Sequence, residues 1–306
     1  MNQMWHNILK AKAINGWGLF WLVSLPMSLV MVLEMTKADM SSPPGVSHMI
    51  GFSVRWAVPL IYLVIAASSM RILFPGAFTN WWLRNRKHIG LCFAVAMAWQ
   101  GAFIFLMSGF HREYYFEEIY YLRDELEGST GYIFLAAMVV TSFHFGRKRI
   151  SPKQWRLLHK SGVYFLWAYP FSVYWWNLHY YRDPQVIDFV FYWTGFAAFV
   201  IRPVAWGMQR YTANTRTGMG TPIWLRSVGG LFVIAGLLLS ATGLQWQEPV
   251  TAWLTAPAWS ANLELWLPFW PFEPFLSLFA IAMGVAFATW VPQNLSNQAA
   301  VATSSK

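Results

Sequence analysis

The chain has 306 residues, of which 57% are hydrophobic and only 11% are charged. Soluble domains usually carry about 25% charged residues, so this composition excludes a chain that is mainly a soluble domain. The formal net charge is +9, and several apolar runs exceed the roughly 18 residues that suggest a bilayer-spanning helix. We therefore assign the positive charge to the cytoplasmic loops of a multi-pass membrane protein, and we do not expect nucleic acid as a partner.

Eight apolar segments predict membrane spans. In chain order they are about 16–35, 49–72, 89–110, 130–145, 157–180, 186–208, 223–244 and 269–291. We expect an all-α membrane protein with a six-helix core over residues 1–210 and two additional helices over 211–292. The small, polar residues 293–306 predict a disordered tail.

Lysine and arginine are concentrated in alternate loops of this arrangement. They include Lys10, Lys12, Arg71, Arg84, Arg86, Lys87, Arg147, Lys148, Arg149, Lys153, Arg156, Arg210 and Arg216. Positive loops stay on the cytoplasmic side of a membrane. An even number of spans then places both termini in the cytoplasm, and a bacterial inner membrane is the expected location.

Two of the opposite loops are distinctive. The segment 111–129 holds six of the 13 acidic residues of the chain. It is interpreted either as a solvated amphipathic helix on the membrane surface or as a docking surface for a basic partner or a cation. The segment 245–268 is rich in tryptophan and proline, which is typical of an interfacial lid.

Four histidines lie near the ends of two predicted spans. His88 and His111 flank the third span, and His159 and His179 are near the ends of the fifth. At a rise of 1.5 Å per residue, His88 and His159 lie at similar depth near the cytoplasm, and His111 and His179 at similar depth outside. A haem between helices needs one imidazole from each of two facing helices, with apolar walls. These four histidines are therefore candidate haem ligands, although each can also be an interfacial side chain.

Other chemistry is less well supported by the sequence. The single cysteine, Cys92, rules out disulfide relay and Cys-based metal sites within the chain. No HExxH motif or closely spaced histidine box is present. Arg55, inside the second span, is a candidate partner of a haem propionate or a phospholipid phosphate, or it extends to the membrane surface.

Short motifs on four consecutive spans match a known family. They are Gly51 with Arg55–Trp56–Ala57, Arg86–Lys87–His88–Ile89–Gly90–Leu91, Thr141–Ser142–Phe143, and Trp155–Arg156–Leu157–Leu158–His159 followed by Tyr164. Through these motifs, residues 15–210 resemble the ferric-reductase-like transmembrane domain family, and within it the MsrQ-type haem membrane subunits.

The resemblance implies an oxidoreductase subunit that moves electrons across the membrane through b-type haem. The donor would be cytoplasmic or a quinol, and the acceptor would be another membrane or outside redox protein. FMN at the cytoplasmic side follows by family analogy only. The chain has no dinucleotide fingerprint, so a flavin or nicotinamide donor would be a separate protein.

The family's haem-ligand positions are only partly kept in this chain. His159 is in register, but the third-span ligand position falls at Gln100 and the second fifth-span position falls at Ser172. Three interpretations stay open. A haem near the cytoplasmic face would use His159 with His88, and a displaced outer haem would use His111 with His179. In the third interpretation the haem is lost, and the chain is an accessory or scaffolding subunit of a membrane complex.

Overall fold

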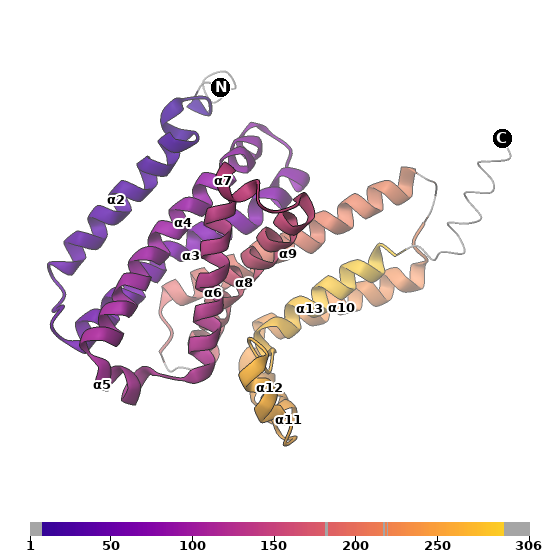
Figure 1. Cartoon of the computed structure of the whole chain (residues 1–306). Coiled ribbons are helices and arrows are strands. Elements are labelled where there is room, and N and C mark those ends of the chain that lie inside the picture. Colours follow the sequence, from indigo (N-terminus) through magenta and orange to yellow (C-terminus); the bar gives the residue numbers. More distant parts are fainter. Residues whose placement is uncertain (1–7, 181–182, 217, 219, 291–306) are drawn as a thin grey trace. The chain divides into compact units, whose positions relative to one another are not determined.

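The structure is a computed structural model, and it describes residues 8–180, 183–216, 218 and 220–290. All regular secondary structure in these ranges is helical (Figure 1). The predicted all-α class is therefore confirmed. The predicted tail over 293–306 lies outside the described residues.

Each of the eight predicted segments overlaps a long helix, but the helices of the fourth and seventh segments end earlier, at Thr141 and Ala241, and the helix of the eighth begins later, at Glu273. The long helices are α2 (Trp17–Met35), α3 (Pro43–Leu73), α4 (Ala77–Phe110), α6 (Leu122–Thr141), α8 (Pro152–His179), α9 (Val186–Arg216), α10 (Ile223–Ala241) and α13 (Glu273–Ala288). The shorter elements are η1 (Lys12–Ile14), α5 (Arg112–Tyr114), η2 (Tyr115–Ile119), α7 (His144–Arg147), α11 (Gly243–Thr255) and α12 (Ser260–Trp266).

Five of these helices, namely α2, α3, α4, α9 and α10, are long and apolar enough to cross a membrane. Helix α13 is apolar but has 16 residues, about 24 Å at the usual rise. That length is less than the roughly 30 Å of a hydrocarbon core. The chain is thus an all-α membrane protein, and the number of eight spans stays a prediction.

The chain forms two compact units, which are described separately. The first contains the described residues up to Ala67 together with Pro75–Pro170, and the second contains Ser68–Phe74 and the described residues from Phe171 onward. The division falls inside α3 and α8. The predicted boundary after residue 210 falls inside α9, which continues to Arg216.

In the first unit, hydrogen bonds around the buried amide of Asn85 fix the start of α2 to α4. The backbone N–H of Gly16 donates to Asn85 Oδ1 at 2.8 Å, and Asn85 Nδ2 donates to Asn15 Oδ1 at 3.1 Å. Trp81 Nε1 donates to the Ile14 carbonyl at 2.9 Å. Asn85 is only 1% exposed, so these bonds satisfy polar groups that would otherwise be buried without partners.

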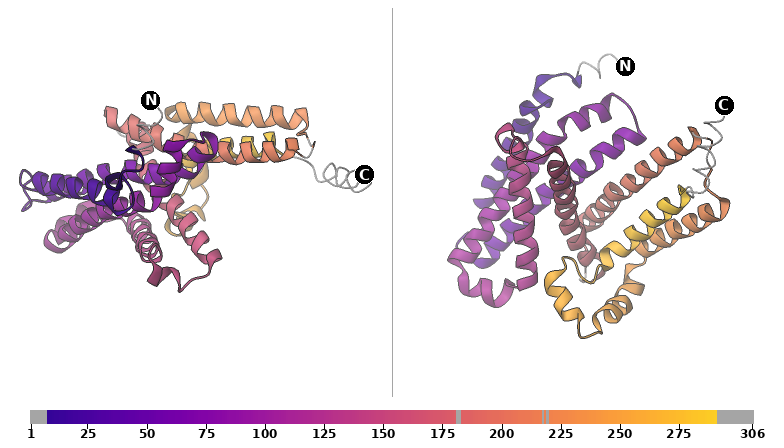
Figure 2. Two further views of the ribbon diagram at one scale, coloured as in Figure 1. Left: turned by 90° about the horizontal axis from the view of Figure 1, so that it is seen from above. Right: turned by 45° about the vertical axis from the view of Figure 1, so that its right-hand side comes forward.

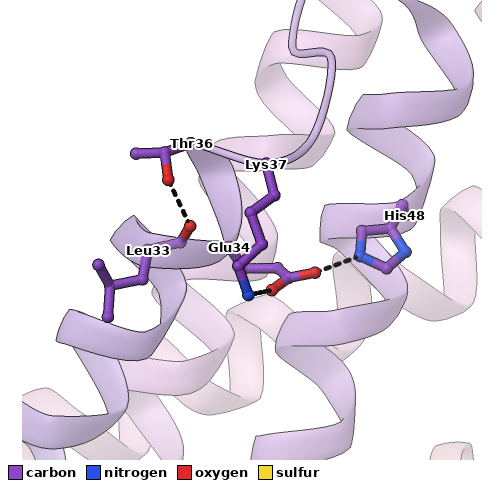
Figure 3. A network of polar contacts seen from close by, with 5 residues as sticks. All are labelled: Leu33, Glu34, Thr36, Lys37 and His48. Atoms are coloured by element: carbon purple, nitrogen blue, oxygen red, sulfur yellow. Dashed lines mark hydrogen bonds and ion pairs between the residues drawn. The ribbon is translucent and has the colours of Figure 1, made fainter.

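The end of α2 meets the start of α3 in an exposed polar network (Figure 3). Glu34 Oε2 accepts from Lys37 Nζ at 3.0 Å, and Glu34 Oε1 lies 3.2 Å from His48 Nε2. Water screens exposed pairs of this kind, so they contribute little to stability. His48 is therefore explained as a surface residue.

The acidic segment is anchored by one tyrosine. Tyr115 packs with Val46, Met49, Phe103 and Met107 in a buried cluster. Its hydroxyl donates to Glu125. Helix α6 begins at Leu122, eight residues before the predicted start of the span. Acidic residues in a first helical turn are stabilised by the helix dipole, which explains the earlier start.

In the second unit, α13 packs against both α9 and α10 through small residues (Figures 1 and 2). A Cβ added to Gly284 would lie 2.6 Å from the carbonyl oxygen of Gly229, and one added to Gly236 would lie 2.6 Å from Ser277 O. Only glycine permits this approach of two backbones. Small residues at helix contacts are common in membrane proteins, because lipid supplies little drive for helices to associate.

Candidate functional site

His159 is held by the end of α6. Its Nε2 lies 3.0 Å from Thr141 Oγ1, and its ring stacks on Trp155 with centroids 4.3 Å apart. The Thr141 hydroxyl donates to the Ala137 carbonyl at 2.7 Å. A hydroxyl has one hydrogen, so at His159 the Thr141 oxygen accepts from Nε2–H. The usual iron-binding nitrogen of this ring is thus engaged in a protein hydrogen bond.

His88 is on α4 and faces the start of α2. Its ring meets Trp17 edge-on with centroids 5.5 Å apart. Its Nδ1 is buried and has no hydrogen-bond partner within the described ranges. A Cβ added to Gly16 would lie 3.8 Å from the His88 ring.

Basic and aromatic side chains surround the two histidines. Lys87 Nζ lies 4.9 Å from the Phe143 ring, and Phe143 stacks on Trp17 at 6.2 Å. The Arg147 guanidinium lies 4.8 Å from the Trp155 ring. We call Trp17, Lys87, Phe143, Arg147 and Trp155 the cation–aromatic cluster. Each cation–π contact contributes about 0.5–1 kcal/mol at exposed sites.

The inner histidine pair does not fit a shared haem as it is arranged. The His88 ring contacts Trp17 of α2, and the His159 ring bonds Thr141 of α6. Ligation by both imidazoles would require His159 to give up this hydrogen bond. His88 and His159 both lie at the cation–aromatic cluster of the first unit. However, the His88 ring contacts α2, whereas the His159 ring is hydrogen-bonded to α6.

Gln100, which the resemblance predicts to be at a haem-ligand position, also has a protein partner. Its Oε1 lies 3.1 Å from the Tyr132 hydroxyl, which is also 3.1 Å from the Met97 carbonyl. The tyrosine hydrogen is shared between these two acceptors. A Cβ added to Gly101 would lie 3.4 Å from the Tyr132 ring, so α6 approaches α4 closely at this level.

The remaining predicted site residues are not brought together within one unit. His111 follows α4 in the first unit, whereas Ser172 and His179 are on the α8 segment of the second. Arg55 has an exposed side chain on α3 and forms no ion pair with the described residues. Its role beside a propionate, and the outer haem on His111 and His179, stay predictions.

The structure reveals a polar site that sequence reasoning missed. Glu273, the first residue of α13, is 0% exposed. Its Oε1 accepts from the Tyr180 hydroxyl at 2.8 Å and from Thr251 Oγ1 at 3.1 Å. The signal in the sequence was a lone acidic residue between Phe272 and Pro274, directly before an apolar run.

Several unpartnered groups accompany Glu273 in the second unit. Six buried side-chain atoms here have no hydrogen-bond partner among the described residues, namely Trp175 Nε1, both ring nitrogens of His179, Gln247 Oε1, Glu273 Oε2 and Ser277 Oγ. We call these five residues, with Tyr180 and Thr251, the Glu273 cluster. Each buried polar group without a partner costs about 1–3 kcal/mol.

The α13 dipole does not compensate the charge of Glu273. A carboxylate at a helix N-terminus gains about 0.3–1 kcal/mol, and up to about 2 kcal/mol in partly buried geometry. Removing an ion from water costs several kcal/mol. No Lys, Arg or His in the described part of the chain forms an ion pair with Glu273.

The residues that the structure describes contain no group of three or more acidic, histidine or cysteine side chains that could hold a metal ion. Comparison with protein-family models, curated proteins and solved structures finds no match. The ferric-reductase-like resemblance therefore stays a prediction.

Proposed function

We propose that this chain is a haem-free accessory subunit of a membrane complex, built on a ferric-reductase-like helical core. The observation that carries the proposal is the hydrogen bond between Gln100 and Tyr132. By the resemblance, Gln100 occupies a haem-ligand position. Here the side chain joins α4 to α6 instead.

A second hydrogen bond supports the same proposal. Thr141 of α6 accepts from His159 of α8, the one family ligand position that is still histidine. Hydrogen bonds between membrane helices contribute on average about 0.6 kcal/mol and at most about 2 kcal/mol each. Helix α6 thus has polar links to both helices that carry haem ligands in the family.

The proposal is tested by the visible spectrum of the purified protein. We expect no Soret or α-band signal in a reduced-minus-oxidised spectrum of protein expressed with ample haem. A haem signal that reaches one haem per chain would contradict the proposal.

A second candidate function is transmembrane electron transfer through b-type haem, from a cytoplasmic or quinol donor to an outside acceptor. The observation that favours it is that the buried Nδ1 of His88 has no hydrogen-bond partner among the described residues. A ring nitrogen without such a partner is available to bind haem iron. If haem is bound, both His88→Ala and His159→Ala should remove it, whereas His48→Ala should not. Haem retained in both of the first two variants would refute the inner-site assignment.

A further inference from the structure

Glu273 lies in the second unit, and no described residue forms an ion pair with it. Its carboxyl group is fully buried, and one of its two oxygens has no partner within the described ranges. We propose that the Glu273 cluster binds an alkali-metal cation, with Glu273 as the charged ligand and Gln247 and Ser277 as neutral oxygen ligands. This inference is independent of whether the chain binds haem.

Hydrogen bonds from two elements fix the Glu273 carboxylate. Tyr180 at the end of α8 and Thr251 of α11 both donate to Oε1. Tyr180 Oη and Thr251 Oγ1 also lie 3.3 Å apart. The carboxylate is therefore held at one oxygen, and Oε2 keeps its lone pairs for another ligand.

The two neutral oxygens lie one helical turn from residues of this network. Ser277 is four residues after Glu273 on α13, and Gln247 is four residues before Thr251 on α11. Residues four apart share a helix face. Gln247 Nε2 donates to the His179 carbonyl at 3.1 Å, which leaves its Oε1 as an acceptor. Gln247 and Ser277 are 6% and 0% exposed.

The chemistry of these atoms selects the class of cation. Carboxylate, amide and hydroxyl oxygens are hard ligands, which suit hard cations. One carboxylate balances one positive charge, whereas a divalent ion would leave an excess charge in a buried site.

The charged groups that the structure describes on the surrounding elements do not oppose a cation. Asp188 of α9 accepts from Asn177 and from the backbone N–H of Gln185, and Glu248 of α11 is exposed. The nearest arginine along α9 is Arg202, ten residues after Tyr192, a ring neighbour of His179. Ten residues correspond to about 15 Å of helix.

The basic residue of α10 is equally remote. Arg226 precedes Gly236, which packs against Ser277, by ten residues or about 15 Å of helix. The titratable side chains next to Glu273 are therefore His179 and Tyr180 of the Glu273 cluster, with Tyr192 of α9 beside His179. None of them is a permanent cation.

The test is the thermal stability of the full chain in detergent at constant ionic strength. Chloride salts of Na⁺, K⁺ and the bulky N-methylglucamine cation are compared. We expect Tm to rise saturably with Na⁺ or K⁺ but not with N-methylglucamine, because binding to the folded state stabilises it. Glu273→Gln should abolish this rise, and the exposed control Glu248→Gln should retain it.

A milder variant covers the case in which Glu273→Gln does not fold. Ser277→Ala removes one neutral ligand and should raise the half-saturating cation concentration by roughly three- to tenfold. The proposal is overturned if the wild-type Tm has no dependence on Na⁺ or K⁺, or if both variants respond like the wild type. A Tm that depends on pH but on neither cation also overturns it, and indicates a bound proton instead.

Discussion

Tyr115 shows how a single side chain can order a charged segment. The ring is 7% exposed in an apolar cluster, and its hydroxyl donates to Glu125. Burial and, secondly, the hydrogen bond to Glu125 raise the pKa of Tyr115 above its ordinary value of 10.0. The folded state therefore favours the neutral phenol.

This property predicts an alkaline loss of stability. The contribution of Tyr115 is fully present below pH 10.0 and falls as the pH rises above it, because the unfolded tyrosine ionises first. Tyr115→Phe should be less stable than the wild type below pH 10.0, since it leaves Glu125 without this donor. Above pH 10.0, the difference in unfolding free energy between the two proteins should become smaller. Thermal unfolding of both proteins across this range measures the effect, and a constant difference would contradict it.

The partners of individual site residues could not be predicted from the sequence. Position and periodicity placed His159 near the cytoplasmic end of a helix, but they did not show that Thr141 occupies its Nε2. The sequence does not indicate the role of Glu273, because the tryptophan- and proline-rich segment before it is typical of an interfacial lid. The hydrogen bonds of Tyr180 and Thr251 to Glu273 connect residues far apart in the chain. A local sequence pattern cannot predict such bonds.

At the scale of the helices, hydropathy predicts where the helices lie in the chain more accurately than it predicts their lengths. Helix α9 continues beyond the predicted residue 208 to Arg216, and α3 begins at Pro43 instead of near 49. Hydropathy marks the part of a helix that matches lipid, whereas the backbone hydrogen bonds continue into polar sequence. The close packing of α10 on α13 was not predicted either, because single glycines in an apolar run do not identify the helix that they contact.

Two adjacent glycines of α10 provide a matched test of this packing. A Cβ on Gly229 would lie 2.5 Å from the Gly284 carbonyl oxygen and 2.7 Å from the Ala288 nitrogen, whereas one on Gly230 would meet no atom within 4 Å. Gly229→Ala should destabilise the protein by about 1–3 kcal/mol. Gly230→Ala should be neutral or stabilising by up to about 1 kcal/mol. Equal unfolding temperatures for the two variants would contradict the close approach.

For the whole molecule, composition alone indicated the environment of the chain. Apolar side chains on the surfaces of the five long apolar helices are compatible with lipid and not with water. The division into two units inside α3 and α8 was not anticipated, since hydropathy reports which segments cross a membrane and not which helices contact one another.

The predicted orientation can be measured with single cysteines. In a Cys92→Ser background, Glu117→Cys should react in intact cells with a membrane-impermeant maleimide, and Gly76→Cys should react only after lysis. Both positions are exposed. The expectation rests on the positive charges around Gly76 and the acidic charges around Glu117. The reverse labelling pattern would show that the protein is inserted the other way round.

The bond from Gly16 to Asn85 also has a consequence for biosynthesis. These residues are 69 positions apart, and synthesis at about 5–20 residues per second needs about 3 to 14 s to cover that interval. During this time, the backbone N–H of Gly16, at the start of α2, has only water or lipid headgroups as partners. The N-terminal end of α2 should therefore stay frayed on the ribosome until α4 emerges, and a nascent chain that stops before Asn85 should expose Asn15 and Gly16 to cross-linking reagents.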